Sequence, residues 1–285
     1  MASAWVLAAM LAACVATLGV SSARMRQQDL SNALQPPSVT HPLGTDEVGR
    51  SVLWRTLYGG AISLSLGLLA AAIAVTIGAA YGAVSGYVGG RIDDVMMRFV
   101  DVLFALPSVL LVMLFTLTVG GWLERLTHIG IEWARAIVLA LAIGGTSWLT
   151  LARVVRGQVL SLRERPFIQA ARALGLSTTR IVVRHLVPNL GGTIAVFGTL
   201  TVPTAILQES FLSFLGIGVQ PPQATWGSLA ADGVRSLNPV RMSWWLVTFP
   251  CLALSVALLA LNFVGEGLRD ALDVRGAEST PSRQA

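Results

Sequence analysis

Six stretches of the sequence contain no charged residue over 17 to 35 positions, and they constrain the fold more than any other feature. They are residues 2–23, 56–90, 102–123, 136–152, 185–208 and 242–265. A helix needs about 20 largely apolar residues to cross ~30 Å of hydrocarbon. Five stretches meet this length, and residues 136–152 reach it if Arg135 and Arg153 extend toward the interfaces. The sequence therefore predicts an all-α polytopic membrane protein with six transmembrane helices.

The composition agrees with a membrane chain and excludes several kinds of chemistry. Of 285 residues, 54% are hydrophobic and 12% are charged, whereas soluble domains carry about 25% charged residues. All 20 basic residues are Arg, so the chain has no Walker A phosphate loop and no Schiff-base lysine. Any nucleotide that drives this protein must bind to another chain. Cys14 and Cys251 form neither a CxxC pair nor a disulfide framework.

Two of the uncharged regions do not fit a simple spanning helix. Residues 56–90 would be about 52 Å long as one straight helix, so we expect this helix to begin in the interface near residues 58–60 and to end around residues 86–87. A further uncharged run, residues 210–231, contains Gly216, Gly218, Pro221 and Pro222, and free backbone groups there could not be satisfied in lipid. We therefore predict an extramembrane loop there.

The distribution of Arg predicts the orientation of the chain. Seven Arg and one acidic residue, Glu164, lie within residues 153–189. Short basic loops remain in the cytoplasm, so this loop and, by parity, both termini are predicted to face inward. Arg24 and Arg26 follow the first helix on the predicted external side and oppose this assignment, but seven charges outweigh two. The first run lacks the charged n-region of a cleaved signal peptide, and we interpret it as a retained helix.

Small and proline residues predict features of the helix interiors. A stripe of small residues at every fourth position includes Gly78, Gly82 and Gly86, and such stripes let membrane helices approach closely. We expect this packing within the subunit, with a partner interface or a solute pathway as the alternative. Pro107 and Pro203 are predicted to lie inside the third and fifth helices and to kink them.

The basic loop has the pattern of a short helix–turn–helix. Pro166 suits a first helical turn, residues 167–174 read as a helix, and Gly175 fits the left-handed position after it, where we predict a positive φ. Ser177 can cap a second helix that Pro188 would stop near residue 187. The loop is either a rigid docking element or a solvated basic loop that serves only topology. It has few aromatic residues to stack on bases, so nucleic-acid binding is disfavoured.

The remaining polar residues give no catalytic or metal site. We expect Asp101 to pair with Arg98 at i,i+3 rather than to act as an ion-relay carboxylate. Glu209, at the outer end of the fifth helix, is predicted to belong to a gate, with substrate binding as the alternative. The three histidines, His41, His128 and His185, lie on both sides of the predicted membrane and cannot share one metal ion.

Three motifs resemble the permease subunits of ATP-binding-cassette (ABC) importers. Gln169-Ala170-Ala171, followed by Gly175, Arg184-His185 and Pro188-Asn189, resembles their EAA loop. Residues 41–46, His-Pro-Leu-Gly-Thr-Asp, resemble a segment after the first helix in the dipeptide and oligopeptide branch. Residues 209–216, with Pro221-Pro222 and Trp226-Gly227, resemble the stretch after the fifth helix. The resemblance covers about residues 41–269. Within the peptide and nickel branch, the chain resembles the second of the two permease subunit types. Gln169 replaces the usual Glu and has no charge to form a salt bridge, and Ser51 replaces a common Asp.

The resemblance implies a type I ABC importer permease fold in the cell inner membrane. It divides the chain into a first helix with an extracytoplasmic segment (residues 1–55), a five-helix core (56–270) with the EAA loop (153–189), and a cytoplasmic tail (271–285). It implies a pore formed with a homologous permease subunit, an extracytoplasmic substrate-binding protein and two ATPase subunits that bind the ATP, so this chain holds no cofactor. The substrate would be a peptide or a related solute, such as a nickel complex, haem or glutathione.

The resemblance also implies roles for individual residues. Residues 167–174 become the candidate coupling helix, with Gly175 as its turn. The candidate ATPase-coupling residues are Phe167, Gln169, Ala170, Ala171, Leu174, Gly175, Arg184 and Pro188. The candidate extracytoplasmic gate and loop residues are Glu209, Gly216, Pro221 and Trp226. The rival hypotheses are a secondary transporter or channel driven by an ion gradient, which would need ionisable groups near the midplane, and a membrane enzyme, which would need a catalytic cluster.

Overall fold

The computed structural model describes residues 2–126, 131–237 and 242–277, and the elements within them are helical apart from one isolated bridge between Thr45 and Ser51. The helices are α1 (Ala2–Ala16), α2 (Leu18–Arg24), η1 (Leu30–Asn32), α3 (Val52–Val88), α4 (Gly90–Ala105), α5 (Ser108–Leu126), α6 (Ile131–Arg163), α7 (Pro166–Ala173), α8 (Thr178–Ile181), η2 (Val182–Leu186), α9 (Val187–Phe214), α10 (Trp226–Arg235) and α11 (Trp245–Ala277). The predicted all-α class is confirmed.

The structure has four continuous candidate spans, and the predicted number of six is reached if each of two bent helix pairs counts as one span. Helices α3, α6, α9 and α11 are each long and apolar enough to cross a membrane. The pairs α1–α2 and α4–α5 qualify only together, with bends of 59° and 89°. The expectation that residues 102–123 form one helix kinked inside by Pro107 is wrong. Leu106 is extended, with ψ of 139°, and the helix restarts at Ser108. Proline lacks an N–H donor and disfavours a helical residue before it.

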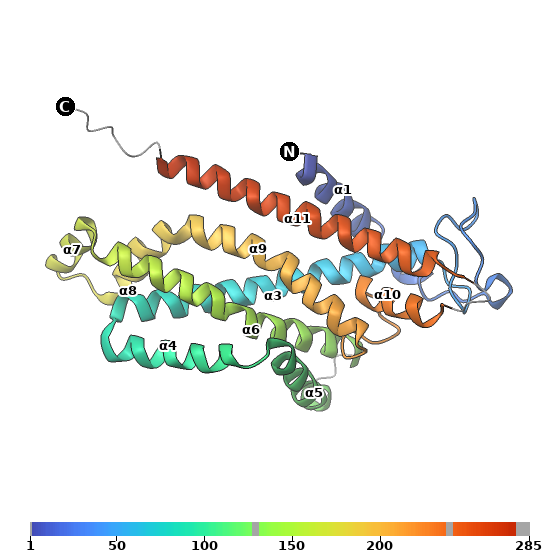
Figure 1. Ribbon diagram of the computed structural model, residues 1–285, viewed down its shortest axis with the longest axis horizontal. Coiled ribbons are helices and arrows are strands. Elements are labelled where there is room, and N and C mark those ends of the chain that lie inside the picture. The colour runs from blue at the N-terminus through green and yellow to red at the C-terminus, as the bar shows by residue number, and fades with distance from the viewer. Residues whose placement is uncertain (1, 127–130, 238–241, 278–285) are drawn as a thin grey trace.

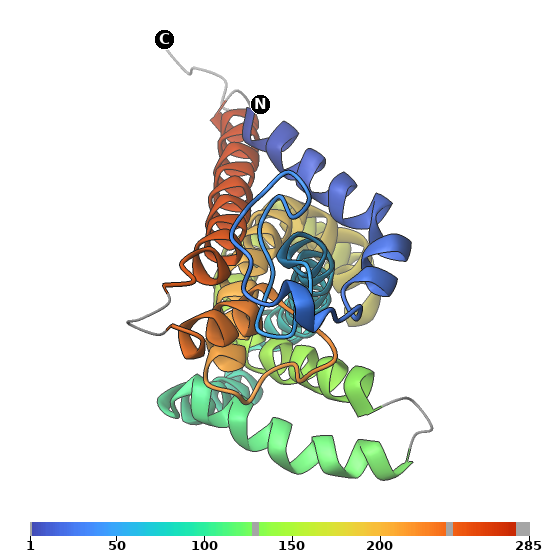
Figure 2. The same ribbon diagram turned by 90° about the vertical axis from the view of Figure 1, so that its right-hand side faces the viewer.

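Helix α3 is the central element of the fold. It is a single helix of 37 residues, about 55 Å long, so it begins six residues before the predicted start at residue 58. In the end-on view of Figure 2, α3 lies in the middle of the molecule, and it contacts α6, α9 and α11. The surplus length projects beyond the hydrocarbon and carries α3 into the polar structures at the ends of the molecule.

The small-residue stripe lies where α3 packs against α6. A Cβ atom at Gly78 would lie 2.8 Å from the carbonyl oxygen of Trp148, and one at Gly82 would lie 2.9 Å from Cβ of Val155. At Gly86 the corresponding distance to the carbonyl oxygen of Arg156 is 2.8 Å. These distances leave no room for a side chain, so the two backbones meet inside the subunit, which is the first of the two predicted alternatives.

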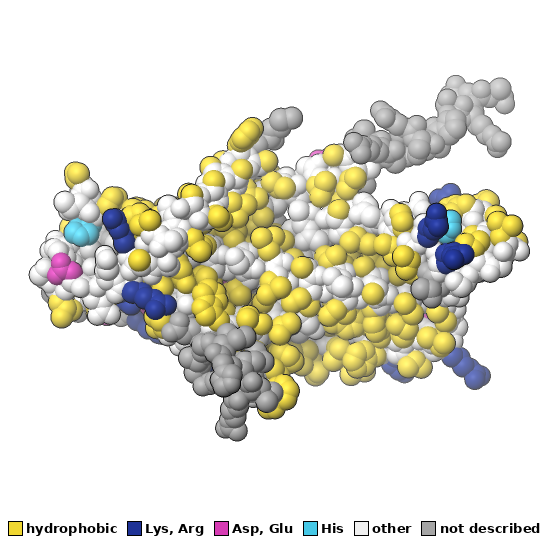
Figure 3. All heavy atoms as spheres, turned by 180° about the vertical axis from the view of Figure 1, so that it is seen from behind, with side chains coloured by type: hydrophobic (Ala, Val, Ile, Leu, Met, Phe, Trp, Pro, Cys, Tyr) yellow, Lys and Arg dark blue, Asp and Glu magenta, His cyan; other side chains and the backbone are white. Residues whose placement is uncertain are grey.

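The molecule has two polar ends separated by an apolar middle. Figure 1 shows α7 and α8 at one end, which we call the α7 end, and α10 with the segment 25–51 at the opposite end, which we call the α10 end. In the space-filling view of Figure 3, the Arg side chains gather toward the two ends and hydrophobic side chains cover the middle. This distribution is the one expected for a chain that crosses a bilayer.

Candidate functional site

Helix α7 forms where the sequence predicted a short helix, shifted by one residue to Pro166–Ala173. Pro166 occupies its first turn, where a missing N–H donor has no consequence. The predicted positive φ of Gly175 is present, at 75°. The N–H of Gly175 donates to the carbonyl of Arg172 at 2.9 Å, and the N–H of Leu176 donates to that of Ala171 at 3.2 Å. This pattern is a Schellman motif, which ends the helix sharply.

The two faces of α7 differ in burial. Ile168 is fully buried and Ala171 is buried, and both belong to an apolar cluster with Tyr87 of α3 and Val159 of α6. The opposite face is open. Phe167 is 43% exposed and Leu174, just after the helix, is 81% exposed. Also on the exposed side are Gln169 and Ala170. The anchored face fixes the helix, and the open face presents apolar side chains outward.

One side chain joins α7 directly to α3. The Nε of Arg172 donates to the hydroxyl of Tyr87 at 3.2 Å, and the Arg172 guanidinium lies 4.7 Å from the Tyr87 ring centroid. From the end of α6, Arg163 donates to the carbonyl of Gly86 at 3.3 Å. Neither contact could be predicted from local sequence, because the paired residues lie 85 and 77 positions apart along the chain. The last turn of α3 is thus tied to α7 and to α6.

Acidic residues of α4 pair with arginines of α6 beneath this end. Asp93, which is 5% exposed, accepts two hydrogen bonds of 2.6 Å from Arg156, and it also accepts one from Ser85 of α3. Asp101 pairs with Arg153 at 2.7 Å, so the predicted partner Arg98 is wrong. A helical i,i+3 spacing was the only signal available in the sequence, whereas the actual partner comes from the neighbouring helix.

The second half of the loop differs from its prediction. Helix α8, the π-helical turn η2 and α9 follow one another without a break, so Pro188 does not stop a helix. Pro188 instead lies in the first turn of α9, where its missing N–H is harmless. The wider π-helical turn lies directly before it, where a proline ring would otherwise clash with the preceding turn. Arg184 lies in η2 with an exposed side chain.

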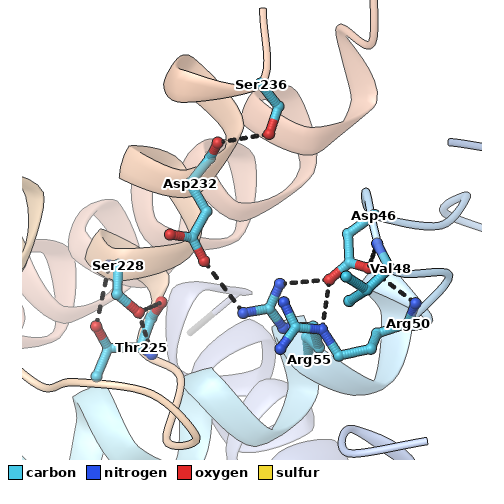
Figure 4. A network of polar contacts seen from close by, with 8 residues as sticks. All are labelled: Asp46, Val48, Arg50, Arg55, Thr225, Ser228, Asp232 and Ser236. Carbon is cyan, nitrogen blue, oxygen red and sulfur yellow. Dashed lines mark hydrogen bonds and ion pairs between the residues drawn. The ribbon is translucent and has the colours of Figure 1, made fainter. Parts of the chain in front are cut away.

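At the α10 end, a buried arginine bridges three elements (Figure 4). Arg55, near the start of α3, is 7% exposed. Its guanidinium donates to Oδ2 of Asp46 at 2.8 Å and to Oδ2 of Asp232 in α10 at 3.2 Å. Arg50 donates to the same Asp46 carboxylate at 2.7 Å. These ion pairs attach the segment 41–50, which contains the motif at residues 41–46, to α3 and α10.

Glu209 lies in the interior of the α10 end and not at an opening. It is fully buried. Its carboxylate accepts hydrogen bonds from Ser63 of α3 at 3.1 Å and from Ser213, one turn further along α9, at 2.7 Å. Ser63 in turn accepts from the backbone N–H of Trp226 at 3.2 Å. Glu209 thus joins α9 to α3 and, through Ser63, to the first residue of α10.

The other predicted residues of this end surround that junction. Trp226 is buried, and its indole N–H donates to the carbonyl of Thr56 at 3.0 Å. Gly216 has a φ of 82°, and Pro221 is exposed. Within the described residues, no group of three or more His, Cys, Asp or Glu residues could hold a metal ion. His41 belongs to the segment 25–51 at the α10 end, whereas His185 belongs to η2, which directly follows α8 at the α7 end. His128 lies outside the described residues.

The chain is similar to a family of transport proteins and to individual members of it. Residues 74–276 match the family described as binding-protein-dependent transport system inner membrane component. The chain is 42% identical over 247 residues to the dipeptide transport system permease protein DppC of Bacillus subtilis, covering 87% of this chain and 72% of that protein. It is 46% identical over 233 residues to the oligopeptide transport system permease protein OppC of Escherichia coli K12, covering 82% and 72%.

A solved structure supports the fold. A chain of the MetNI methionine ABC transporter in an inward-facing conformation matches with a TM-score of 0.57 at 17% identity, covering 77% of this chain and 97% of that one. At this identity the similarity concerns the fold alone. The predicted type I ABC importer permease fold is thereby confirmed.

Proposed function

We propose that this chain pairs with a homologous subunit to form a pore for peptides. The chain belongs to the family of binding-protein-dependent transport system inner membrane components, which are the permease subunits of ABC importers. The relatives are named as dipeptide and oligopeptide transport permeases, which favours peptides over the other solutes considered. The chain is a transport subunit and not an enzyme. Two ATPase subunits would bind the ATP that drives import.

The observation that carries this proposal is the two-sided construction of α7. Its inner face is buried through Ile168 and Ala171, while Phe167 and Leu174 remain exposed on a basic surface. Exposed apolar residues rimmed by polar ones mark interaction sites. We assign this exposed face to an ATPase subunit. The candidate coupling residues are Phe167, Gln169, Ala170, Ala171, Leu174, Gly175, Arg184 and Pro188.

The proposed orientation places the α7 end in the cytoplasm. The seven Arg residues of the loop 153–189 support this through the preference of short basic loops for the cytoplasmic side, and both termini would then also be cytoplasmic. Residues 1–55 would supply the first helix and an external segment, residues 56–270 the five-helix core, and residues 271–285 the tail.

The α10 end would then meet the substrate-binding protein. We propose that the outer gate region is formed by Glu209, Gly216, Pro221 and Trp226. Because Glu209 is buried, its role in this region would be structural. It holds α9 against α3 and the start of α10 in the conformation described. Movement of α9 away from α3 would break the hydrogen bond with Ser63. Glu209 would therefore stabilise one state of the gate without contacting substrate.

The experiment is uptake of a radiolabelled peptide, trialanine, into proteoliposomes that contain the complex purified with its partner subunits and its binding protein. We expect uptake with internal ATP, and we expect it to persist when an ionophore collapses the ion gradients. Uptake that continues without ATP on a proton gradient alone would support the secondary-transporter hypothesis and contradict this one. A complex that imports other solutes but no peptide would overturn the substrate assignment only.

A further inference from the structure

A concavity of about 390 Å³ lies beside the break between α4 and α5. Leu106 and Pro107 of the break, the middle of α6 and the outer part of α9 form its walls. Its volume falls within the range of ~300–1,000 Å³ that is typical of small-molecule sites. Neither the EAA loop nor the α10 end includes these residues, so no role has yet been given to them.

Three polar side chains from three different helices meet at this concavity. They are Ser108 at the start of α5, Thr150 in α6 and Gln208 in α9. In the part of the chain that the structure describes, these three side chains make no hydrogen bond. Other polar residues of the wall behave differently. Thr146 and Ser147 both donate to the carbonyl of Ile143 in their own helix.

The absence of hydrogen bonds matters because these residues lie far from the ends of the membrane helices. Thr150 lies near the middle of α6, 13 residues from its end at Arg163, which corresponds to ~20 Å along the helix axis. Polar groups at such a depth are costly in hydrocarbon, and irregular backbone there is tolerated only where it is buried in protein or lines an aqueous cavity. The α4–α5 break is such an irregular segment. Unpaired groups and broken backbone therefore point to the same place.

The chemistry of the wall indicates what it would accept. The residues that line it include no ionisable side chain. Its free groups are two hydroxyls and one carboxamide, which together offer both hydrogen-bond donors and acceptors. A main-chain amide presents the complementary acceptor and donor, whatever side chain it carries. A free charge would find no counter-charge in this wall.

We propose that Ser108, Thr150 and Gln208 line the solute path of this subunit and bind the main-chain amide groups of a passing peptide. The inference rests on the proposed function for the identity of the solute. The claim that these three side chains line a water-accessible concavity at membrane depth does not depend on that function. Because recognition is through main-chain groups, peptides with acidic, basic and neutral side chains should pass at similar rates.

The first test measures water access with cysteine substitutions in a Cys14→Ala/Cys251→Ala background. Gln208→Cys and Thr150→Cys are compared with Leu207→Cys, which is adjacent to Gln208 and 55% exposed but outside the concavity. The complex is assembled with its partner subunits and treated with a charged, membrane-impermeant maleimide. Thiolate forms only in water, so we expect the two test positions to react at least tenfold faster than Leu207→Cys. Equal rates at all three positions would overturn the proposal.

The second test measures transport of trialanine. We expect Gln208→Leu and Thr150→Val to lower the uptake rate roughly three- to tenfold each, the effect of losing one hydrogen bond. The matched control is Thr118→Val, because Thr118 is also exposed in a membrane helix but donates to Leu114 of its own helix. Unchanged uptake in both variants would overturn the binding role. If the parent complex imports no trialanine although both cysteines react, the assignment of peptides as the substrate fails, while the water-accessible concavity stands.

Discussion

The α7 end and the α10 end of the molecule are stabilised by different kinds of contact. At the α10 end, Arg55 is buried between two carboxylates and Glu209 is enclosed by hydroxyl groups. At the α7 end, a short helix rests on an apolar cluster through Ile168 and Ala171, and its outer side is open. The α10 end is therefore held together by buried charges and hydrogen bonds, whereas the α7 end is held by apolar packing and presents an apolar face that a partner can cover.

The largest effect is expected for Arg55→Met, which removes the charge that joins Asp46 to Asp232. Breaking a buried ion pair costs about 3–5 kcal/mol. Arg50 still contacts Asp46, and the side chain of Asp232 is 40% exposed, so we expect a loss near the lower end of this range. Thermal unfolding of the purified complex in detergent measures the loss. The control is Arg50→Met, which removes a partly exposed arginine from the same carboxylate and should cost far less. Equal effects of the two substitutions would show that burial of Arg55 does not hold this end together.

The next prediction separates the two faces of α7. Ile168→Ala empties a fully buried position and should destabilise the protein by about 2–5 kcal/mol. Phe167→Ala, on the exposed face, should leave the melting temperature nearly unchanged while lowering peptide-stimulated ATPase activity of the complex. Both quantities are measured on the same preparations. A melting temperature that falls as much with Phe167→Ala as with Ile168→Ala would contradict the distinction between the faces.

A smaller effect is expected for Gly175→Ala. The positive φ of 75° disfavours any residue with a Cβ atom, at a cost of roughly 1–2 kcal/mol, so α7 should shift and transport per ATP hydrolysed should fall. Gly157→Ala is the matched control. A Cβ atom meets no atom within 4 Å at either position, but Gly157 has an ordinary helical φ. Coupling that survives Gly175→Ala intact would show that this turn is not needed.

The smallest effect concerns the link between α7 and α3. Tyr87→Phe removes the hydroxyl that accepts from Arg172 but keeps the ring, and one hydrogen bond is worth about 0.5–1.5 kcal/mol. We expect a small loss of coupling between ATP hydrolysis and uptake. Tyr81→Phe removes a similar hydrogen bond, from Tyr81 to the carbonyl of Met96 in α4, without touching α7. Coupling losses of equal size in both variants would remove any special role for Tyr87.

The sequence predicted those features that depend on local chemistry. Charge-free runs identified the long helices, Pro166 marked the start of α7, and Gly175 marked its end, because each signal depends only on neighbouring residues. The three motifs identified the family for a similar reason, since they are read in order along the chain.

Features that depend on distant partners could not be predicted. Asp93 and Arg156 are 63 residues apart, and Arg55 and Asp232 are 177 residues apart. No periodicity connects such pairs. The 89° bend at Pro107 was underestimated for a related reason. Proline predicts a disturbed helix, but the size of the bend depends on how α5 then packs against α6.

The uninterrupted course of α3 gives it a mechanical consequence. Arg55 lies near its first residue and Tyr87 near its last, so one stiff rod of about 50 Å connects the clamp at one end with the arginine contact at the other. If such a rod pivots at its outer end by about 5°, its other end moves by roughly 4 Å, more than the length of a hydrogen bond. A lever of this length converts a slight rocking motion at one membrane surface into a displacement large enough to make or break contacts at the other.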